Sequence, residues 1–242
     1  MEKRGWLVYL SNAAVFLQYD GVKILIDGLY RDTSGYFSQL PDAVWDGMQK
    51  GNGELAHIDY LLFTHSHADH FYAPYLQKYL QKNEVKGYAL PCSEDTLYGC
   101  RAISFDAGKK TVLGSGVTCR YLDIRHLDPR YYGVTNRCYL LEAGRKKLLF
   151  LGDADYQEEV YQELAEEEID VAFVTPVFYN HPAGRKILQE RLRVGKIILY
   201  HLPFLAEDTM QMGKMAERDI KRYAREGQPV VIWNRTGQSL VF

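Results

Sequence analysis

Four side chains able to bind a metal ion follow one another closely in the segment His65-Ser66-His67-Ala68-Asp69-His70. In an extended chain, residues two apart point to the same side, so His65 and His67 can bind one metal ion together. Asp69 and His70 come as the chain turns, and they project at a different angle that suits a second metal ion. Imidazole and carboxylate ligands of this kind are typical of zinc, iron or manganese. The alternative is a surface loop of polar residues, which the ordered spacing after an apolar stretch disfavours.

The element that must position these ligands is a strand at 59–63, whose nearly continuous apolar run predicts burial on both faces. A helix is expected at 72–81, where the apolar residues have helical spacing and Pro74 stands in the first turn. In the preceding segment, 29–57, the hydrophobic residues show no periodic spacing, and a loop of that length more often has a function than serves only as a connection. Its aromatic residues predict either a lid over a site or an oligomer contact.

Short strands and helices alternate through the rest of the chain. Further strands are expected at 6–10, 13–19, 22–26, 85–90, 102–105, 111–113, 117–125, 137–143, 147–151, 170–174, 196–200, 229–233 and 239–242. Further helices are expected at 157–168, 183–192 and 207–225. This mixed order predicts an α+β fold in which two sheets pack together with helices outside. No linker rich in Pro, Gly or Ser interrupts the order, so residues 1–242 are expected to form one domain.

Length and composition indicate an ordinary globular chain. The 242 residues carry 29 basic against 31 acidic side chains, and 47% of the residues are hydrophobic. That balance argues against a protein that holds nucleic acid by charge, because such proteins usually carry a clear basic excess. No apolar run approaches the ~20 residues that a membrane span needs.

The cellular compartment is predicted from the N-terminus and the cysteines. The apolar stretch 6–10 follows Lys3-Arg4 as in a signal peptide, but it continues into alternating strands, so the strand interpretation is preferred. None of the four cysteines forms a C-x-x-C pair, which excludes the usual zinc knuckle and redox motifs. A reduced, cytoplasmic protein is therefore expected.

Four further residues carry a resemblance to a known family. Each ends or follows an apolar, strand-like run: Asp27, His126, Asp153 and His201. Together with the segment 65–70, they occur in the order found in the metallo-β-lactamase superfamily of metal-dependent hydrolases, which the sequence resembles over nearly its whole length. The resemblance implies a four-layer αββα sandwich, with two mixed sheets packed face to face and helices outside. This fold agrees with the layering expected from the order of the elements.

The resemblance also implies a ligand set, position by position. The first metal ion would be bound by His65, His67 and His126. The second would be bound by Asp69, His70 and His201, and Asp153 would bridge the two. Asp27 would orient a ligand from behind. The implied cofactors are two divalent metal ions, zinc before manganese or iron, and the implied reaction is hydrolysis by a hydroxide that bridges them. Asp69 and Asp153 are therefore also candidate catalytic residues.

Several branches of the superfamily fit this sequence poorly. Secreted β-lactamases of the best-known type carry cysteine where Asp153 stands, and flavodiiron oxygen reductases usually carry glutamate where His67 stands. Nucleases of the superfamily tend to add a large insert or a tRNA-binding arm, and neither is evident in this chain. The compact intracellular branch related to ascorbate-6-phosphate lactonase and small phosphodiesterases is closest.

The expected function is hydrolysis of a small-molecule lactone, thioester or phosphodiester by a dinuclear metal centre. A nuclease that acts on nucleic-acid phosphodiesters and a non-enzymatic metal-binding module are the alternatives. The expected partner is a small-molecule substrate. No membrane partner is expected, nucleic acid is disfavoured by the charge balance, and a homo-oligomer is left open.

Residues outside the ligand set give weaker signals. His181 follows a strand end, where it either binds substrate and protonates a leaving group as a catalytic residue, or is a loop histidine in solvent. Basic residues between 185 and 196 either bind a phosphate group or form a solvated helix face. His57 precedes the strand at 59–63 and is expected to be structural. Tyrosines that flank the ligand loops are candidates to line a pocket: Tyr30, Tyr72, Tyr131, Tyr132 and Tyr179.

Overall fold

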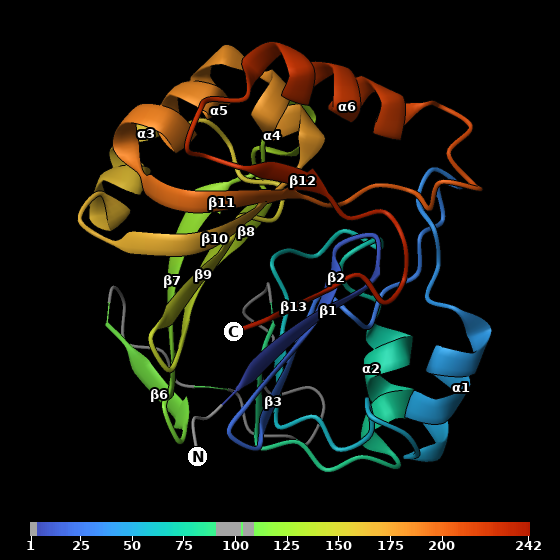
Figure 1. Ribbon diagram of the computed structural model, residues 1–242. Helices are drawn as coiled ribbons and strands as arrows, with labels where there is room; N and C mark the ends of the chain where they lie inside the picture. Colours follow the sequence, from blue (N-terminus) through green and yellow to red (C-terminus); the bar gives the residue numbers. More distant parts are fainter. Residues whose placement is uncertain (1–3, 91–102, 104–108) are drawn as a thin grey trace.

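The structure, a computed structural model, describes residues 4–90, 103 and 109–242. Two β-sheets pack face to face, and helices cover the outer face of each (Figure 1). This α+β arrangement confirms the predicted αββα sandwich with two mixed sheets. The predicted strand 102–105 lies outside the described residues apart from Ile103.

The first sheet has six strands in the order β13-β1-β2-β3-β4-β5. Their bounds are Gly5–Ser11 (β1), Ala14–Tyr19 (β2), Val22–Ile26 (β3), Tyr60–Leu62 (β4), Gly87–Ala89 (β5) and Ser239–Val241 (β13). β3 and β4 pair in parallel, with Ile26 opposite Leu62. Because parallel strands end at the same edge of a sheet, Asp27 and the ligand segment 65–70 emerge side by side.

The second sheet has seven strands in the order β12-β11-β10-β9-β8-β7-β6. Their bounds are Thr111–Gly114 (β6), Val117–Arg125 (β7), Thr135–Ala143 (β8), Lys146–Phe150 (β9), Glu168–Val174 (β10), Arg193–Leu199 (β11) and Val230–Ile232 (β12). β9 to β12 pair in parallel, whereas β6 to β9 pair antiparallel. β7, β9 and β11 therefore run in one direction and end at one edge.

Helices form the two outer layers (Figure 1). α1 (Asp42–Lys50) and α2 (Ala73–Leu80) cover the first sheet. The second sheet is covered by α3 (Glu158–Tyr161), α4 (Pro176–Asn180), α5 (Pro182–Lys186) and α6 (Met212–Tyr223). Shorter turns are η1 (Pro129–Tyr131), η2 (Gln162–Leu164) and the π turn η3 (Ile187–Arg191). None of the described helices is long and apolar enough to span a membrane.

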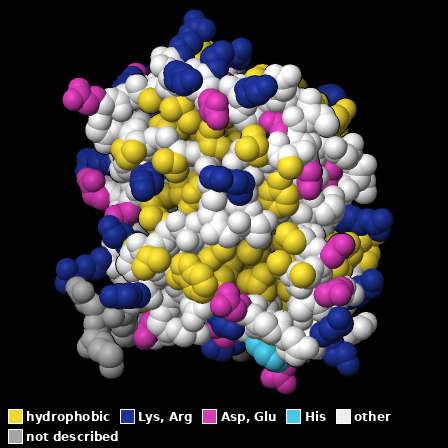
Figure 2. Space-filling view, turned by 45° about the vertical axis from the view of Figure 1, so that its right-hand side comes forward, with side chains coloured by type: hydrophobic (Ala, Val, Ile, Leu, Met, Phe, Trp, Pro, Cys, Tyr) yellow, Lys and Arg dark blue, Asp and Glu magenta, His cyan; other side chains and the backbone are white. Residues whose placement is uncertain are grey.

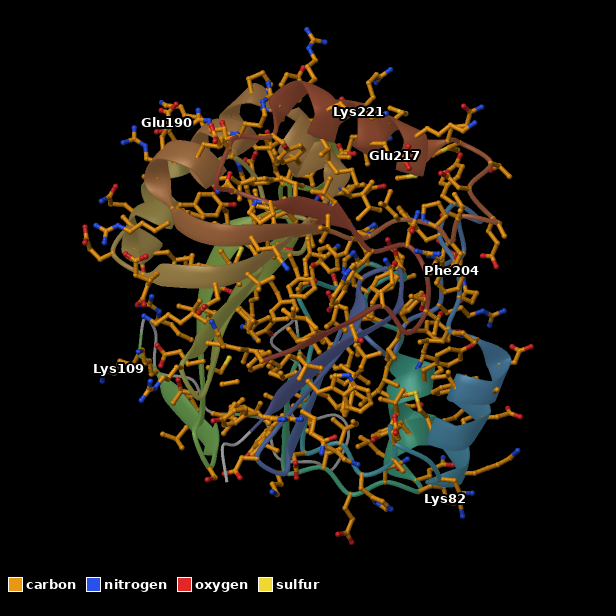
Figure 3. All side chains as sticks on the ribbon, in the orientation of Figure 1. Lys82, Lys109, Glu190, Phe204, Glu217 and Lys221 are labelled. Atoms are coloured by element: carbon orange, nitrogen blue, oxygen red, sulfur yellow. The ribbon has the colours of Figure 1, made fainter. Side chains whose placement is uncertain are left out.

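Because side chains alternate between the two faces of a strand, neighbouring residues of one strand belong to different apolar layers. In β1, Tyr9 faces the second sheet, whereas Leu10 belongs to the layer beneath α1 and α2. Figure 3 shows side chains filling the space between the layers, while Glu190 and Lys221 point outward from the helical layer. Apolar side chains on both sheet faces explain why the continuous apolar run at 59–63 forms a strand inside the sheet.

Two predicted helices on the second sheet differ from expectation, one in its end and one in its type. The helix expected at 157–168 consists of α3 and η2 and ends at Leu164. Glu168 already belongs to β10, where it lies in register with Arg193 of β11 and forms an ion pair with it. The helix expected at 183–192 changes to a π turn after Lys186. Pairing with a neighbouring strand, which no local pattern shows, sets the first of these boundaries.

The remaining differences lie in capped helices. The helix expected at 207–225 begins only at Met212, because the Asp208 carboxylate accepts the backbone N–H groups of Met212 and Gly213 at 2.8 Å each. The segment 29–57, in which no element was expected, contains α1. Gly51 ends α1 in the left-handed conformation that commonly terminates helices.

Candidate metal centre

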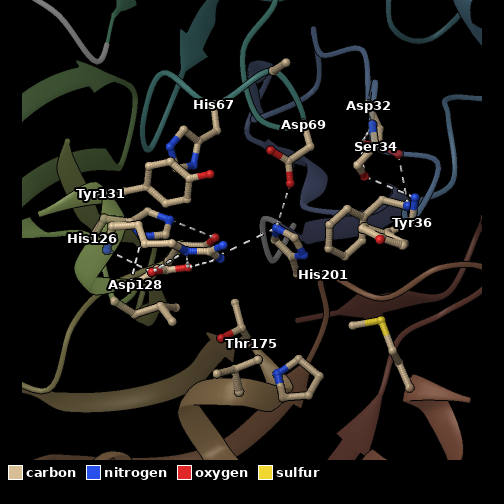
Figure 4. Close-up of a pocket in the computed structure, with 18 of the residues that line it drawn as sticks. Asp32, Ser34, Tyr36, His67, Asp69, His126, Asp128, Tyr131, Thr175 and His201 are labelled. Carbon is tan, nitrogen blue, oxygen red and sulfur yellow. Dashed lines mark hydrogen bonds and ion pairs between the residues drawn. The ribbon is translucent and has the colours of Figure 1, made fainter. Parts of the chain in front are cut away.

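The predicted ligands lie together at one rim of the sandwich, on loops that follow four strands. The segment 65–70 follows β4, His126 follows β7, Asp153 follows β9 and His201 follows β11. Figure 4 shows His67, Asp69, His126 and His201 around one shared cavity. Positions far apart in the sequence therefore meet because their strands end at the same edge of the two sheets.

Three imidazoles form a first group: His65, His67 and His126, whose candidate ligand atoms all lie within 4.8 Å of one another. His65 Nε2 lies 3.1 Å from His67 Nδ1, and His126 Nε2 lies 3.3 Å from Asp153 Oδ2. The Nε2 atoms of His67 and His126 are buried and make no hydrogen bond within the described part of the chain. Leaving such atoms unpaired is costly, which marks this point as a place for a further binding partner.

A second group consists of Asp69, His70 and His201. His70 Nε2 lies 2.7 Å from His201 Nε2, which in turn lies 3.3 Å from Asp69 Oδ2. Asp153 stands between the groups, because its Oδ2 is 3.9 Å from both His65 Nε2 and His70 Nε2. The structure thus brings all seven predicted ligands together, with Asp153 in the bridging place.

Asp27 lies fully buried behind the ligands and orients two of them. Its Oδ2 accepts a hydrogen bond from His70 Nδ1 at 2.9 Å, and Thr64 donates its N–H and its O–H to the two carboxylate oxygens at 2.7 Å each. Because the Thr64 proton goes to Asp27, Thr64 Oγ1 accepts from His65 Nδ1 at 3.1 Å. Both imidazoles therefore donate through Nδ1, which leaves Nε2 to hold a metal ion once any proton on it has left. The sequence pattern did not single out Thr64, although its place directly before His65 is a usable signal.

Backbone strain marks the loops that carry the site. Asn12, Asp27 and His201 have φ values of 47°, 47° and 58°, a region that residues other than glycine enter rarely. Asn12 Nδ2 donates to the Asp69 carbonyl at 2.7 Å, and the Asn12 carbonyl accepts the His201 N–H at 2.9 Å. Asn12, which sequence reasoning missed, thus ties together the two loops that carry the second group.

Burial and charge shift the protonation of the cluster. Burial lowers the pKa of His65 well below its usual value, so this imidazole is neutral at pH 7. Burial acts the same way on His70, but the nearby carboxylates, Asp69 foremost, outweigh it and raise the pKa of His70 to about 9. Burial alone would raise the pKa of Asp153, whereas the facing imidazoles, His201 foremost, hold it well below its usual value.

Two metal ions fit this donor set. Five imidazoles and two carboxylates surround one small volume, with unpaired nitrogens aimed into it. His126 needs one adjustment, because its Nδ1 accepts the Asp128 N–H at 3.0 Å and its ring proton therefore lies on Nε2. Holding a metal ion through Nε2 requires the Asp128 contact to break and the proton to move or leave.

A cavity of about 480 Å³ opens above the ligands (Figure 4). One wall is the loop 31–40, in which the Asp32 carboxylate accepts the backbone N–H groups of Ser34, Gly35 and Phe37. The Phe37 ring stands edge-on to His201, with ring centroids 4.3 Å apart. This placement favours the lid interpretation of the segment 29–57 over an oligomer contact.

Comparison with known proteins decides the family. Residues 39–217 match the model of the beta-lactamase superfamily domain. The chain belongs to this superfamily. The predicted resemblance is thereby confirmed, and the predicted enzyme class, a metal-dependent hydrolase, agrees with it.

Relatives within the superfamily show how far the likeness extends. A UPF0173 protein of Pyrococcus furiosus is 28% identical over 231 residues, which are 94% of this chain and 92% of the relative. An isothiocyanate hydrolase from Delia radicum gut bacteria has a TM-score of 0.69 and 17% identity, over 98% of this chain and 99% of that one. CmlA, a diiron beta-hydroxylase from Streptomyces venezuelae, has a TM-score of 0.62 and 17% identity, over all of this chain but only 54% of CmlA. These structural likenesses establish the fold, and the chemistry must be argued from the site.

His181 lies apart from the superfamily ligand set. It is exposed at the N-terminus of α5, where its Nδ1 accepts the Ala183 N–H at 3.2 Å and its ring stacks on Tyr156 at 4.0 Å. It is not among the described residues that line the cavity. This geometry favours the alternative of a solvent-exposed loop histidine that caps a helix.

The structure also places the flanking tyrosines and the basic residues between 185 and 196 relative to the cavity. Of the five flanking tyrosines, Tyr131 alone is among the described residues that line the cavity, and its ring stands edge-on to His67 at 4.5 Å. The basic cluster lies elsewhere: Lys186 and Arg191 both pair with Glu158 on the outer helical surface. These surface ion pairs favour the interpretation of a solvated helix face.

Proposed function

We propose that this protein hydrolyses a small, neutral carbonyl ester, a lactone or a thioester, at a centre of two zinc ions. The observation that carries the proposal is a cavity that five of the seven candidate ligands line and whose walls offer no unpaired cation among the described residues. In the reaction, water adds to the carbonyl carbon, the C–O or C–S bond breaks, and a proton from water ends on the leaving oxygen or sulfur.

The charge of the walls favours a neutral substrate over a phosphodiester. Arg130 is the cation among the described lining residues, and Asp128 binds it through Nε at 3.0 and 3.1 Å and through Nη2 at 2.6 Å. Beyond the two metal ions, which themselves bind phosphate oxygens, a phosphodiester would gain from free cations on the walls and a nucleic-acid strand from a basic groove. Figure 2 shows basic and acidic side chains interspersed over one face of the molecule, in keeping with the net charge of −2.

The residues of the chain have distinct tasks in this reaction. When bound, two zinc ions lower the pKa of water and polarise the carbonyl group. Asp153 and Asp69 face the cavity with 15% and 19% of their side chains exposed, and they can accept the proton that water gives up. Phe37 and Tyr131 pack against His201 and His67 and shield the ligands from bulk water.

The test is metal analysis of the native protein together with turnover of lactones, thioesters and phosphodiesters by the zinc-loaded chain. We expect two metal ions per chain and turnover of carbonyl esters. Asp153→Asn and His67→Ala should lower turnover by more than the roughly 10–100-fold that changes behind a metal ligand cost, while in the presence of a chelator their melting curves stay close to that of the metal-free native chain.

Other outcomes of these measurements would favour a different function. Turnover confined to phosphodiesters would favour the phosphodiesterase or nuclease alternative. A chain that binds no metal on addition of zinc, manganese or iron would favour a non-enzymatic module. Full activity of either variant would show that the ligand assignment is wrong.

A further inference from the structure

The walls of the cavity carry apolar side chains from four separate parts of the chain. We name Tyr36, Tyr131, Val177 and Met212 the apolar collar; they come from the loop 31–40, η1, α4 and the start of α6. Tyr36, Tyr131 and Val177 are 55%, 42% and 52% exposed. Single exposed hydrophobic residues are ordinary, but several that converge on one concave site indicate a binding surface.

The charged groups beside the apolar collar are held by partners in their own loops. The carboxylate of Asp32, which also lines the cavity, accepts hydrogen bonds from backbone N–H groups of its own loop and from Ser34 Oγ at 2.6 Å. Arg130 is paired with Asp128. The part of a substrate that lies above the ligands therefore meets largely apolar walls with no unpaired cation among the described residues.

Two further exposed apolar side chains lie on the loop that leads to the collar. Leu205 and Met210, which are 64% and 49% exposed, lie on the loop between β11 and α6, and Met212 of the collar follows two residues after Met210. The Phe204 N–H donates to Ser38 Oγ at 2.7 Å and ties this loop to the loop 31–40, beside which it runs in Figure 1.

The collar is held in place before any ligand binds. Tyr131 stands edge-on to His67 and His126 at 4.5 and 5.5 Å, and its turn is fixed by the Asp128 carboxylate, which accepts the Arg130 N–H. Tyr36 follows the turn that Asp32 holds, and its own N–H donates to Ser34 Oγ at 3.1 Å. Walls that are already ordered lose little entropy when they bind an apolar group.

We propose that the apolar collar binds a hydrocarbon chain, so that the substrate is a lactone or thioester carrying an alkyl or acyl chain. This inference rests on the proposed function and names its substrate class. The carbonyl group lies over the ligands, and the chain lies against the collar and extends toward Leu205 and Met210. The chain takes no part in the bond changes, and its contribution is binding.

Turnover as a function of chain length tests the inference. The zinc-loaded full chain is assayed on γ-lactones substituted from methyl to octyl and on thioesters from acetyl to decanoyl. We expect kcat/KM to rise about two-fold per methylene, less than the roughly four-fold that full burial of a methylene supplies. The double variant Tyr36→Ser, Val177→Ser should flatten this rise, so that its loss of kcat/KM relative to the native chain grows with chain length.

Val112→Ser is the matched control, because Val112 is 73% exposed and is not among the described residues that line the cavity. Its strand, β6, lies far from α4 and α6, which carry Val177 and Met212 (Figure 1). It should keep the native dependence on chain length. Turnover of short esters without any rise along either series overturns the collar and leaves the proposed function standing. Absence of turnover on every ester overturns the proposed function instead.

A binding measurement tests the collar without turnover. Octan-1-ol is titrated calorimetrically into the native chain, the double variant and Val112→Ser. We expect the native chain and Val112→Ser to bind it equally and the double variant to bind it at least several-fold more weakly. Equal affinity in all three proteins, or no binding in any, overturns the inference whatever the assays show.

Discussion

At the scale of single residues, one threonine sets the protonation of the metal centre. Thr64 gives its only hydroxyl proton to Asp27, so its oxygen accepts from His65, while Asp27 accepts from His70. The ligands of the segment 65–70 could be predicted from residue types and spacing, and His126, Asp153 and His201 from the resemblance to the family. Their tautomers could not, because these depend on a buried contact between two strand ends of the first sheet.

Thr64→Val is expected to lower metal affinity by about 10–100-fold with little change in the fold, since valine fills the same volume without the hydroxyl. His65 then loses the acceptor that keeps its proton on Nδ1, and Asp27 loses a donor. Competition with a chelator of known zinc affinity measures the change. Thr64→Ser keeps the hydroxyl and should retain native affinity, and an unchanged affinity in Thr64→Val would contradict this assignment.

At the scale of elements, strands were predicted more closely than helices. β3 and β7 have the predicted bounds, because alternation and the turn at Asp20-Gly21 are local features. The start of α6 was wrong because Asp208 caps the helix from four residues before its first residue. The end of the acidic helix was wrong because Glu168 pairs across the sheet with β11. Sequence patterns therefore missed helix caps and pairings between distant segments, because both depend on the three-dimensional structure.

Asn12 connects two such segments, and its removal is expected to weaken the second metal site selectively. In Asn12→Ala the hydrogen bond to the Asp69 carbonyl is lost, and alanine is strained by about 1–2 kcal/mol at a positive φ. We expect the zinc content after dialysis to fall from two toward one per chain.

His57→Ala controls for the strain alone, because His57 has a φ of 53° and lies at the entry of β4, whose other end carries the ligand segment. This variant should lose similar stability and keep both metal ions. If both variants lose zinc equally, the effect of Asn12 is general destabilisation rather than positioning.

At the scale of the whole molecule, the ligand cluster joins the two sheets. The segment 65–70 and Asp27 belong to the first sheet, whereas His126, Asp153 and His201 belong to the second. A ligand set of this kind could be predicted from its order in the sequence, and the layering from the order of strands and helices. The largely apolar walls could not, because Tyr36, Val177 and Met212 lie on loops and helix starts with no common pattern.

Because the cluster joins the sheets, removing both metal ions with a chelator is expected to lower the thermal midpoint by about 15–30 °C. Each metal ion present at about 1,000 times its Kd stabilises by about 4 kcal/mol, so two give about 8 kcal/mol, and each kcal/mol moves the midpoint of a chain of this size by about 2–4 °C. The gap between metal-loaded and metal-free protein should widen as pH rises from about 6 to about 9. Carboxylates, Asp69 foremost, outweigh burial and raise the pKa of His70 to about 9, so metal must displace a proton there at neutral pH. The same raised pKa stabilises the metal-free fold below the ordinary histidine range, and that contribution is lost as pH rises through about 9.

Calorimetric scans of the metal-loaded and the metal-free protein at several pH values measure the gap between their thermal midpoints. Asp153→Asn is the control, and it should show little of this gap. A gap that stays constant with pH would contradict metal binding through these imidazoles.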